Sequence, residues 1–241
     1  MPTTLIERQR DFSREFRGEG LMPSGFDALC QMGLERDVAT LPQTKIKGID
    51  IYQEDKFLIH VEPNFFRQDP GVRWVSQPAL LEMLVSKCEE NSDFSFFRGW
   101  RCTDIVEQNK RVKGIKVVQG SEVREIEGDI VIGADGRTSV LRRLLNPKLH
   151  VYKQIIDVVW FKLPRPEFLN PGIGLVSVSP GNACLSFPVY GDQLQVGWLI
   201  KKGHFGEIKR QGKEVWFQNL RNSLPKHFAN HLEKYHSIKE M

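Results

Sequence analysis

The alternation of apolar and polar positions predicts a chain built largely from β-strands. Residues 3–7, TTLIE, read as a short apolar strand, and residues 45–61 contain two further β-rich runs. Short alternating runs over residues 94–128, separated by turn signals such as QNK and QGS, predict a β-meander. Four strand-like runs over residues 155–202, joined by short turns, predict an antiparallel sheet.

Helical spacing marks two segments in the first half of the chain and further helices at its end. Residues 23–34 begin with Pro23, where a first-turn proline is tolerated, and carry Gly33 where a C-cap glycine belongs. Residues 78–90 place apolar side chains at helical intervals. The runs KEVWFQNLRNSL and KHFANHLEKYH predict that helices close the chain.

Residues 129–134, DIVIGA, differ from the runs before them because they are continuously apolar. That pattern suits a strand buried on both faces of a layered α/β sheet. Because four strand-like runs follow residue 150, before the helices that close the chain, we expect an α/β fold class with two domains. The first is a nucleotide-binding domain over residues 1–150, with β insertions near 45–72, and the second is a β-sheet domain over residues 151–241.

Composition excludes several function classes. The formal net charge of +4 is spread along the 241 residues, which is too weak to favour nucleic acid or an anionic membrane. The four cysteines form no CxxC pair, which favours a cytoplasmic, reducing location. No apolar run approaches the ~18 residues of a membrane span, and the first residues lack the apolar core of a signal peptide. His227 and His231 share a predicted helix but lack a third ligand, so we expect no metal site.

The stretch GDIVIGADGRTSVLRRLL reads as a strand, a glycine turn and a helix. Gly133 and Gly136 allow close approach and unusual dihedral angles, and Asp135 projects from the turn. The start of the following helix offers unpaired N–H groups that suit phosphate or ribose oxygens. An ordinary strand-to-helix turn, capped by Asp135 or Thr138, explains the same residues equally well.

Three more residues stand at positions where a nucleotide could be held. Glu7 ends a strand, as the ribose-binding acid of a dinucleotide fold does. Arg17 is flanked by glycines and could pair with a pyrophosphate, and Gln77 stands at a strand end before a helix. Taken one at a time, they read equally well as a surface acid, a basic loop and a helix cap.

Together these segments resemble the FAD-dependent monooxygenases, in particular the para-hydroxybenzoate hydroxylase-like aromatic hydroxylases. The resemblance rests on LIERQRDFSREFRGEGLMPSGFDALCQMGL, VRWVSQPALLEMLV and the DG turn, in that order, and extends over nearly the whole chain. It implies that Glu7 binds the adenosine ribose and that Arg17 and Gln77 contact FAD. It implies that Asp135, in the turn with Gly133 and Gly136, lies near the pyrophosphate and also affects NAD(P)H binding.

The sequence departs from that family in two motifs. No GxGxxG loop stands before Glu7, and the Gly-Asp pairs at 128–129 and 191–192 lack the His- and Pro-rich context of the second flavin motif. The chain therefore resembles the middle of a flavin hydroxylase, cut at both ends. Without the glycine loop that cradles the pyrophosphate, we expect it to bind FAD weakly or not at all by itself.

The resemblance implies an α/β fold made of a partial Rossmann-like FAD-binding domain and a partial, antiparallel substrate domain. The implied reaction is NAD(P)H- and O2-dependent hydroxylation of an aromatic or similar small molecule. Because the cofactor carries that chemistry, we name no catalytic residue. A non-catalytic remnant without stable FAD stays open, as does a reductase- or halogenase-like relative. The substrate, the choice of NADH or NADPH and the oligomeric state are not fixed by the sequence.

Overall fold

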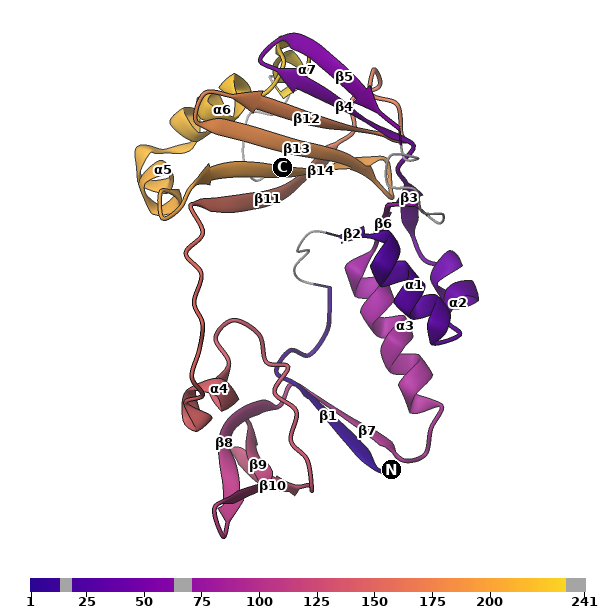
Figure 1. Cartoon of the computed structure of the whole chain (residues 1–241), viewed down its shortest axis with the longest axis vertical. Helices are drawn as coiled ribbons and strands as arrows, with labels where there is room; N and C mark the ends of the chain where they lie inside the picture. The colour runs from indigo at the N-terminus through magenta and orange to yellow at the C-terminus, as the bar shows by residue number, and fades with distance from the viewer. Residues whose placement is uncertain (14–18, 63–70, 233–241) are drawn as a thin grey trace. The chain divides into compact units, whose positions relative to one another are not determined.

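The computed structural model describes residues 1–13, 19–62 and 71–232. The chain divides into two compact units (Figure 1). Unit 1 comprises Met1–Arg14 and Leu81–Tyr152, and unit 2 comprises Glu15–Leu80 and Lys153–Met241. The predicted α/β class is confirmed, whereas the domain boundary predicted near residue 150 stays a prediction.

Unit 1 contains a parallel strand pair and a separate meander. The first strand, β1 (Thr3–Glu7), forms where the sequence predicted it and pairs in parallel with β7 (Phe94–Arg98). The meander has the order β10-β9-β8 and is antiparallel throughout, with strands Arg101–Gln108 (β8), Arg111–Gln119 (β9) and Glu122–Glu127 (β10). The predicted meander is therefore one strand too long, because β7 pairs with β1 instead.

The buried strand predicted over residues 129–134 is wrong. Nothing in the described residues pairs with this segment, and Ile130 and Ile132 are 74% and 83% exposed. An extended apolar segment becomes a strand only when a neighbour satisfies its backbone groups, and here none does. The helix predicted after it is present as α4 (Val140–Leu145).

Helix α3 (Gln77–Glu89) contains the division between the units. Within unit 1, its Glu82 receives a two-pronged ion pair from Arg98 of β7, with Nη1 donating to Oε1 at 2.7 Å and Nη2 donating to Oε2. The guanidinium also lies over the ring of Phe96, 4.7 Å from its centroid. Bidentate geometry of this kind fixes the helix against the strand.

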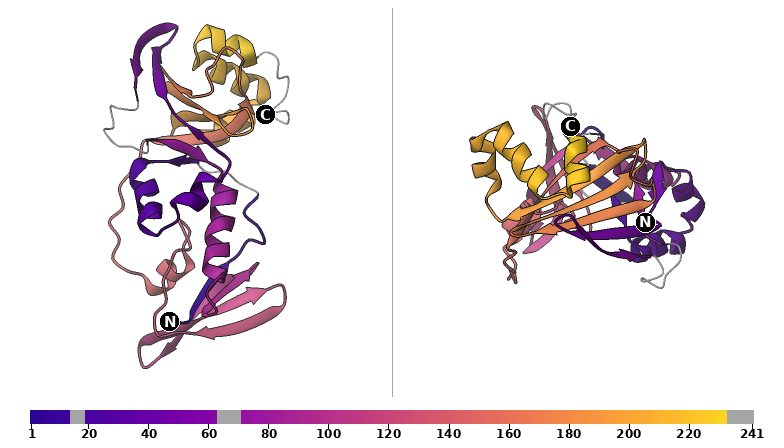
Figure 2. Two further views of the ribbon diagram at one scale, coloured as in Figure 1. Left: turned by 90° about the vertical axis from the view of Figure 1, so that its right-hand side faces the viewer. Right: turned by 90° about the horizontal axis from the view of Figure 1, so that it is seen from above.

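Unit 2 is built around a six-stranded sheet of order β11-β14-β13-β12-β4-β5 (Figures 1 and 2). The four predicted C-terminal strands form its antiparallel part: Ile156–Pro164 (β11), Ile173–Ser179 (β12), Asn182–Val189 (β13) and Gln193–Lys201 (β14). The β-rich insertion contributes β4 (Gly48–Gln53) and β5 (Lys56–Val61). Strand β4 pairs in parallel with β12, so the sheet is mixed.

A smaller sheet and two helices complete the first part of unit 2. The sheet has the order β2-β6-β3, with strands Gly20–Leu21 (β2), Arg73–Val75 (β6) and Gln43–Lys45 (β3). The helices are α1 (Pro23–Gln31) and α2 (Glu35–Ala39). Pro23 opens α1, and Gly33 follows it with a φ of 76°, as the sequence predicted.

Three helices cover one face of the six-stranded sheet: α5 (Phe205–Gln211), α6 (Lys213–Asn222) and α7 (Lys226–Leu232), as the view from above shows (Figure 2). Trp198, Leu220 and Phe228 are almost fully buried between them and the sheet. His227 and His231 both pack against the Phe168 ring, at centroid distances of 5.4 and 6.2 Å. No group of three metal-ligating side chains occurs in the described residues.

The opposite face of this sheet is only partly covered. At one end the small sheet packs on it, and Trp74 stacks on Phe187 with ring centroids 4.1 Å apart. Elsewhere the strand pattern places Val158, Trp160 and Lys162 of β11 on this face, and Val158 is 38% exposed. We call this side the open face and the other the helix-covered face.

Candidate functional site

The glycine turn of unit 1 needs both of its glycines. Gly136 has a φ of 80°, a conformation that side chains with a Cβ rarely adopt. A Cβ on Gly133 would lie 3.3 Å from Cδ1 of Leu141, so the glycine allows the segment to pass close to α4. The turn therefore has the close approach and the left-handed residue that the sequence predicted.

Asp135 is held by the start of α4. Its Oδ1 accepts a hydrogen bond from Ser139 Oγ, and its Oδ2 accepts from the backbone N–H groups of Val140 at 2.6 Å and Leu141 at 3.3 Å. Burial opposes the charged form, but these hydrogen bonds outweigh it and lower the pKa of Asp135. Asp135 thus accepts from the first two N–H groups of α4, but the N-cap residue is Ser139, whose Oγ accepts from the N–H of Arg142 at 3.0 Å. The N-cap predicted at Asp135 or Thr138 is therefore wrong by position.

These bonds leave Asp135 with hydrogen-bonding capacity. A carboxylate offers about four lone-pair directions, and Oδ1 accepts from Ser139 alone in the described part of the chain. The carboxylate is also on the surface of unit 1. Binding the start of α4 and binding a nucleotide are therefore compatible.

Glu7 ends β1 in unit 1, which also contains the turn. Its Oε1 accepts from the backbone N–H of Gln9 at 2.8 Å, and its carbonyl accepts from the N–H of Trp100 at 3.1 Å. In β8, burial raises the pKa of the Cys102 thiol, and the negative charge of Asp135 adds to the rise.

The remaining two predicted contacts belong to other parts of the chain. Gln77 is the first residue of α3 and lies in unit 2, where Ser76 Oγ accepts from the N–H of Ala79 at 3.4 Å. The cap at this helix start is thus Ser76 and not Gln77. Arg17 lies outside the described residues. Glu7 and the turn belong to the same unit, and the roles of all these residues toward FAD stay predictions.

A buried ionic cluster in unit 2 was not found from the sequence. The side chain of Glu19 has no exposed surface, and its Oε2 forms an ion pair with Lys162 Nζ at 2.9 Å. Tyr190 donates its hydroxyl proton to Glu19 Oε1 at 2.8 Å and accepts from Lys162 Nζ at 3.0 Å. Burial alone would lower the pKa of Lys162, but the bonds to Tyr190 and Glu19 raise it.

Gln195 extends this cluster across the open face. It stands opposite Lys162 in the β11–β14 register, and its Oε1 accepts from Trp74 Nε1 at 2.7 Å and from the N–H of Glu19 at 3.3 Å. Its Nε2 is buried without a hydrogen-bond partner in the described residues. We refer to Glu19, Trp74, Lys162, Tyr190 and Gln195 as the Glu19 cluster.

Half-exposed apolar side chains lie beside the Glu19 cluster on the open face. Trp160 is two residues before Lys162 on the same side of β11, and its ring lies over Gly197, where an added Cβ would be 2.5 Å away. Leu199 and Val176 are half-buried on this face. Partly exposed apolar side chains thus lie next to Lys162, whose ammonium is paired with Glu19 and Tyr190.

A glycine turn before a helix and a strand that ends in an acid are features of the class of dinucleotide-binding folds. The model of the family described as "FAD binding domain" matches residues 1–230. The chain belongs to this family, the FAD-binding domains of flavin-dependent monooxygenases related to para-hydroxybenzoate hydroxylase. The resemblance inferred from the sequence is confirmed.

Relatives agree with this membership. The chain is 26% identical to a 6-methylpretetramide 4-monooxygenase of Streptomyces rimosus over 99% of this chain and 57% of that protein. It is 26% identical to squalene monooxygenase SE2 of Panax ginseng, over 73% of this chain and 33% of that protein. The chain thus spans about half or less of these relatives.

Solved structures share the fold. PqsL of P. aeruginosa in complex with 2-aminobenzoylacetate superposes with a TM-score of 0.75 at 15% identity, covering 95% of this chain and 63% of that one. Aklavinone-11 hydroxylase, in a complex with FAD and aklavinone, superposes with a TM-score of 0.72 at 15% identity, covering 91% of this chain and 45% of that one. In the described residues, no helix is long and apolar enough to cross a membrane.

Proposed function

We propose that this chain forms the FAD-contacting and substrate-facing part of a flavin-dependent monooxygenase that hydroxylates a small aromatic molecule with NADH or NADPH and O2. The observation that carries the proposal is the DG turn, where Gly136 adopts its left-handed conformation and Asp135, on the surface, accepts from the first N–H group of α4. Family membership supports the same cofactor. In line with its cysteine pattern, we place the protein in the cytoplasm, without a nucleic-acid partner.

The residues at the turn fit part of an FAD molecule. Gly136 has open space where a Cβ would stand, so its backbone can be approached closely. Oδ1 of Asp135 can accept a hydrogen bond from a ribose hydroxyl, and the Glu7 carboxylate would accept one from the adenosine ribose. When bound, the flavin supplies the redox chemistry that activates oxygen, while the chain binds and orients the reactants.

The open face would hold the substrate. Trp160 offers a half-buried ring for stacking, and the ammonium of Lys162 places positive charge beside it. Two similar proteins are named for oxygenation of a small molecule, a 6-methylpretetramide 4-monooxygenase and an aklavinone-11 hydroxylase. By analogy with them, we propose an aromatic substrate that bears an acidic oxygen.

One observation favours a second candidate, a non-catalytic remnant. The apolar segment 129–134 has no strand partner in the described residues, and Ile132 is 83% exposed. A chain in this state would retain the turn but lack a complete cofactor cradle.

Oxidation of NADH and NADPH by the purified protein with added FAD separates the two candidates. The monooxygenase proposal expects small phenols to accelerate oxidation in air and not under nitrogen. No saturable FAD binding and no phenol-stimulated, oxygen-dependent oxidation would instead support the remnant.

A further inference from the structure

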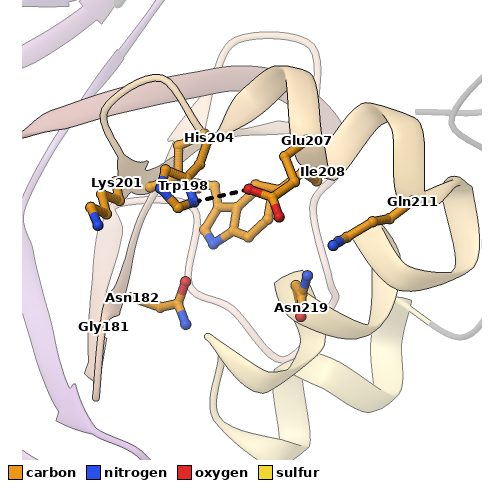
Figure 3. Close-up of a pocket in the computed structure, with 10 residues that line it drawn as sticks. Gly181, Asn182, Trp198, Lys201, His204, Glu207, Ile208, Gln211 and Asn219 are labelled. Carbon is orange, nitrogen blue, oxygen red and sulfur yellow. Dashed lines mark ion pairs between the residues drawn. The ribbon is translucent and has the colours of Figure 1, made fainter.

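A cavity lies on the helix-covered side of the six-stranded sheet, in unit 2. Its volume is about 300 Å³, at the lower end of small-molecule sites. It is bounded by the β12–β13 turn, the end of β14 and helices α5 and α6 (Figure 3). Because Trp198 at its base belongs to the helix-covered face, this cavity is separate from the open face beside Lys162.

Three side-chain amides enter this cavity from three different elements. They are Asn182 of β13, Gln211 of α5 and Asn219 of α6, and Figure 3 shows them around a common space. No amide of the three has a hydrogen-bond partner within the described residues. Each offers two N–H donors and a carbonyl acceptor, so together they present donors and acceptors at close intervals.

Charge in the cavity is nearly balanced. Glu207 Oε2 lies 3.6 Å from Nδ1 of His204, which faces it one helical turn earlier. Lys201 is at the rim, and its ammonium points away from the other lining side chains in Figure 3. An anion would meet the Glu207 carboxylate, and a cation would meet the basic rim, so neither sign of charge is favoured.

Apolar side chains supply part of the lining, namely Trp198, Ile200 and Ile208. Trp198 is only 1% exposed and donates its Nε1 proton to Ser223 Oγ at 3.1 Å, so little of its ring is open for stacking. A flat aromatic ligand would therefore gain little there. A molecule with many hydroxyl groups would gain more, because each hydroxyl both donates to and accepts from carboxamides.

We propose that this cavity binds a small neutral polyol of about the size of a monosaccharide, held by the amides of Asn182, Gln211 and Asn219 and the carboxylate of Glu207. The proposal does not depend on flavin binding or on hydroxylation. It assigns a ligand site to the face of the sheet opposite the open face.

Saturation-transfer NMR on the purified chain tests this site, with glucose, galactose and glycerol as neutral probes. Glucose is expected to give a saturable signal. Replacing one amide, as in Asn219→Leu or the more exposed Gln211→Ala, is expected to weaken binding about five- to tenfold, the loss of about one hydrogen bond. Gln218→Leu is the matched control, since Gln218 lies on α6 outside the cavity and bonds to Asn222.

Three results would overturn the proposal. One is the absence of a saturable signal from every neutral probe. Another is tighter binding of glucuronate or glucosamine than of glucose, which would show that the cavity selects an ion. The third is an equal loss of binding in Gln218→Leu and Gln211→Ala, with circular dichroism showing that both variants are folded.

Discussion

The two polar clusters of this chain are built in opposite ways. In the DG turn, Asp135 is on the surface, and its hydrogen bonds reach at most six residues along the chain. In the Glu19 cluster the carboxylate is fully buried, and its segment bonds to Gln195, 176 residues away. The first cluster is local and accessible, whereas the second joins segments that are distant in sequence.

Because of this difference, we expect the two clusters to have different roles. A surface carboxylate with spare acceptor capacity can exchange water for a ligand at little cost to the fold. A buried ion pair costs desolvation that only its partners offset, so its removal should affect the fold first. We therefore expect the Glu19 cluster to control stability and the DG turn to control cofactor affinity.

The largest effect is expected from separating the buried charges. Glu19→Gln leaves the Lys162 ammonium largely buried without its counter-charge, which should lower the free energy of unfolding by about 3 kcal/mol. Lys162→Met should cost a similar amount because Glu19 is then unpaired. Urea denaturation of each variant measures the loss.

The double variant Glu19→Gln with Lys162→Met is the control for that prediction. Because it removes both charges, it should recover most of the stability that either single variant loses. Additive losses in the double variant would show that the two residues act independently, contrary to the 2.9 Å ion pair.

The same ion pair predicts a loss of stability in alkali. The pKa of Lys162 is higher in the folded state than in the unfolded state. The contribution of this ammonium to the free energy of unfolding is therefore fully present below the unfolded pKa of about 10.4, and it is lost as the pH rises through the folded pKa. Unfolding free energies above pH 10 should therefore fall more steeply in the natural protein than in the double variant. Parallel pH profiles would contradict a role for this ammonium.

A smaller effect is expected at the DG turn. Asp135→Ala removes the acceptor for the first N–H groups of α4 and should cost about 1 kcal/mol. The folded state lowers the pKa of Asp135, so this difference should disappear as the pH falls through the folded pKa. Asp129→Ala is the control, because its only described ion pair, with Lys113 at 3.8 Å, is exposed.

The sequence revealed the local features and missed the distant ones, for reasons that these clusters illustrate. Gly133, Asp135 and Gly136 lie within four residues, so a strand–turn–helix pattern was enough to find them. The contacts of Glu19 with Lys162 and Tyr190 join segments that are far apart in the sequence. No short sequence motif predicts such contacts. The sequence signal for this cluster was the acidic residue Glu19 between Gly18 and Gly20, and its burial became known only from the structure.

Strand pairing failed for a related reason. Alternation and turn residues located all four C-terminal strands, but they do not specify partners. The chain pairs β7 with β1 and β12 with β4, and it leaves residues 129–134 unpaired in the described structure. Apolar character predicted a strand there, yet backbone pairing decides whether one forms.

The account is tested most directly by an FAD titration of the natural protein, Asp135→Ala, Asp129→Ala and the Glu19→Gln, Lys162→Met double variant, followed by flavin fluorescence. It predicts weak, saturable binding that Asp135→Ala weakens about tenfold, equivalent to about 1.4 kcal/mol, while the other two variants bind as the natural protein does. Equal affinities for Asp135→Ala and Asp129→Ala would contradict the assignment of the DG turn to the flavin, and no saturable binding by the natural protein would support the remnant instead.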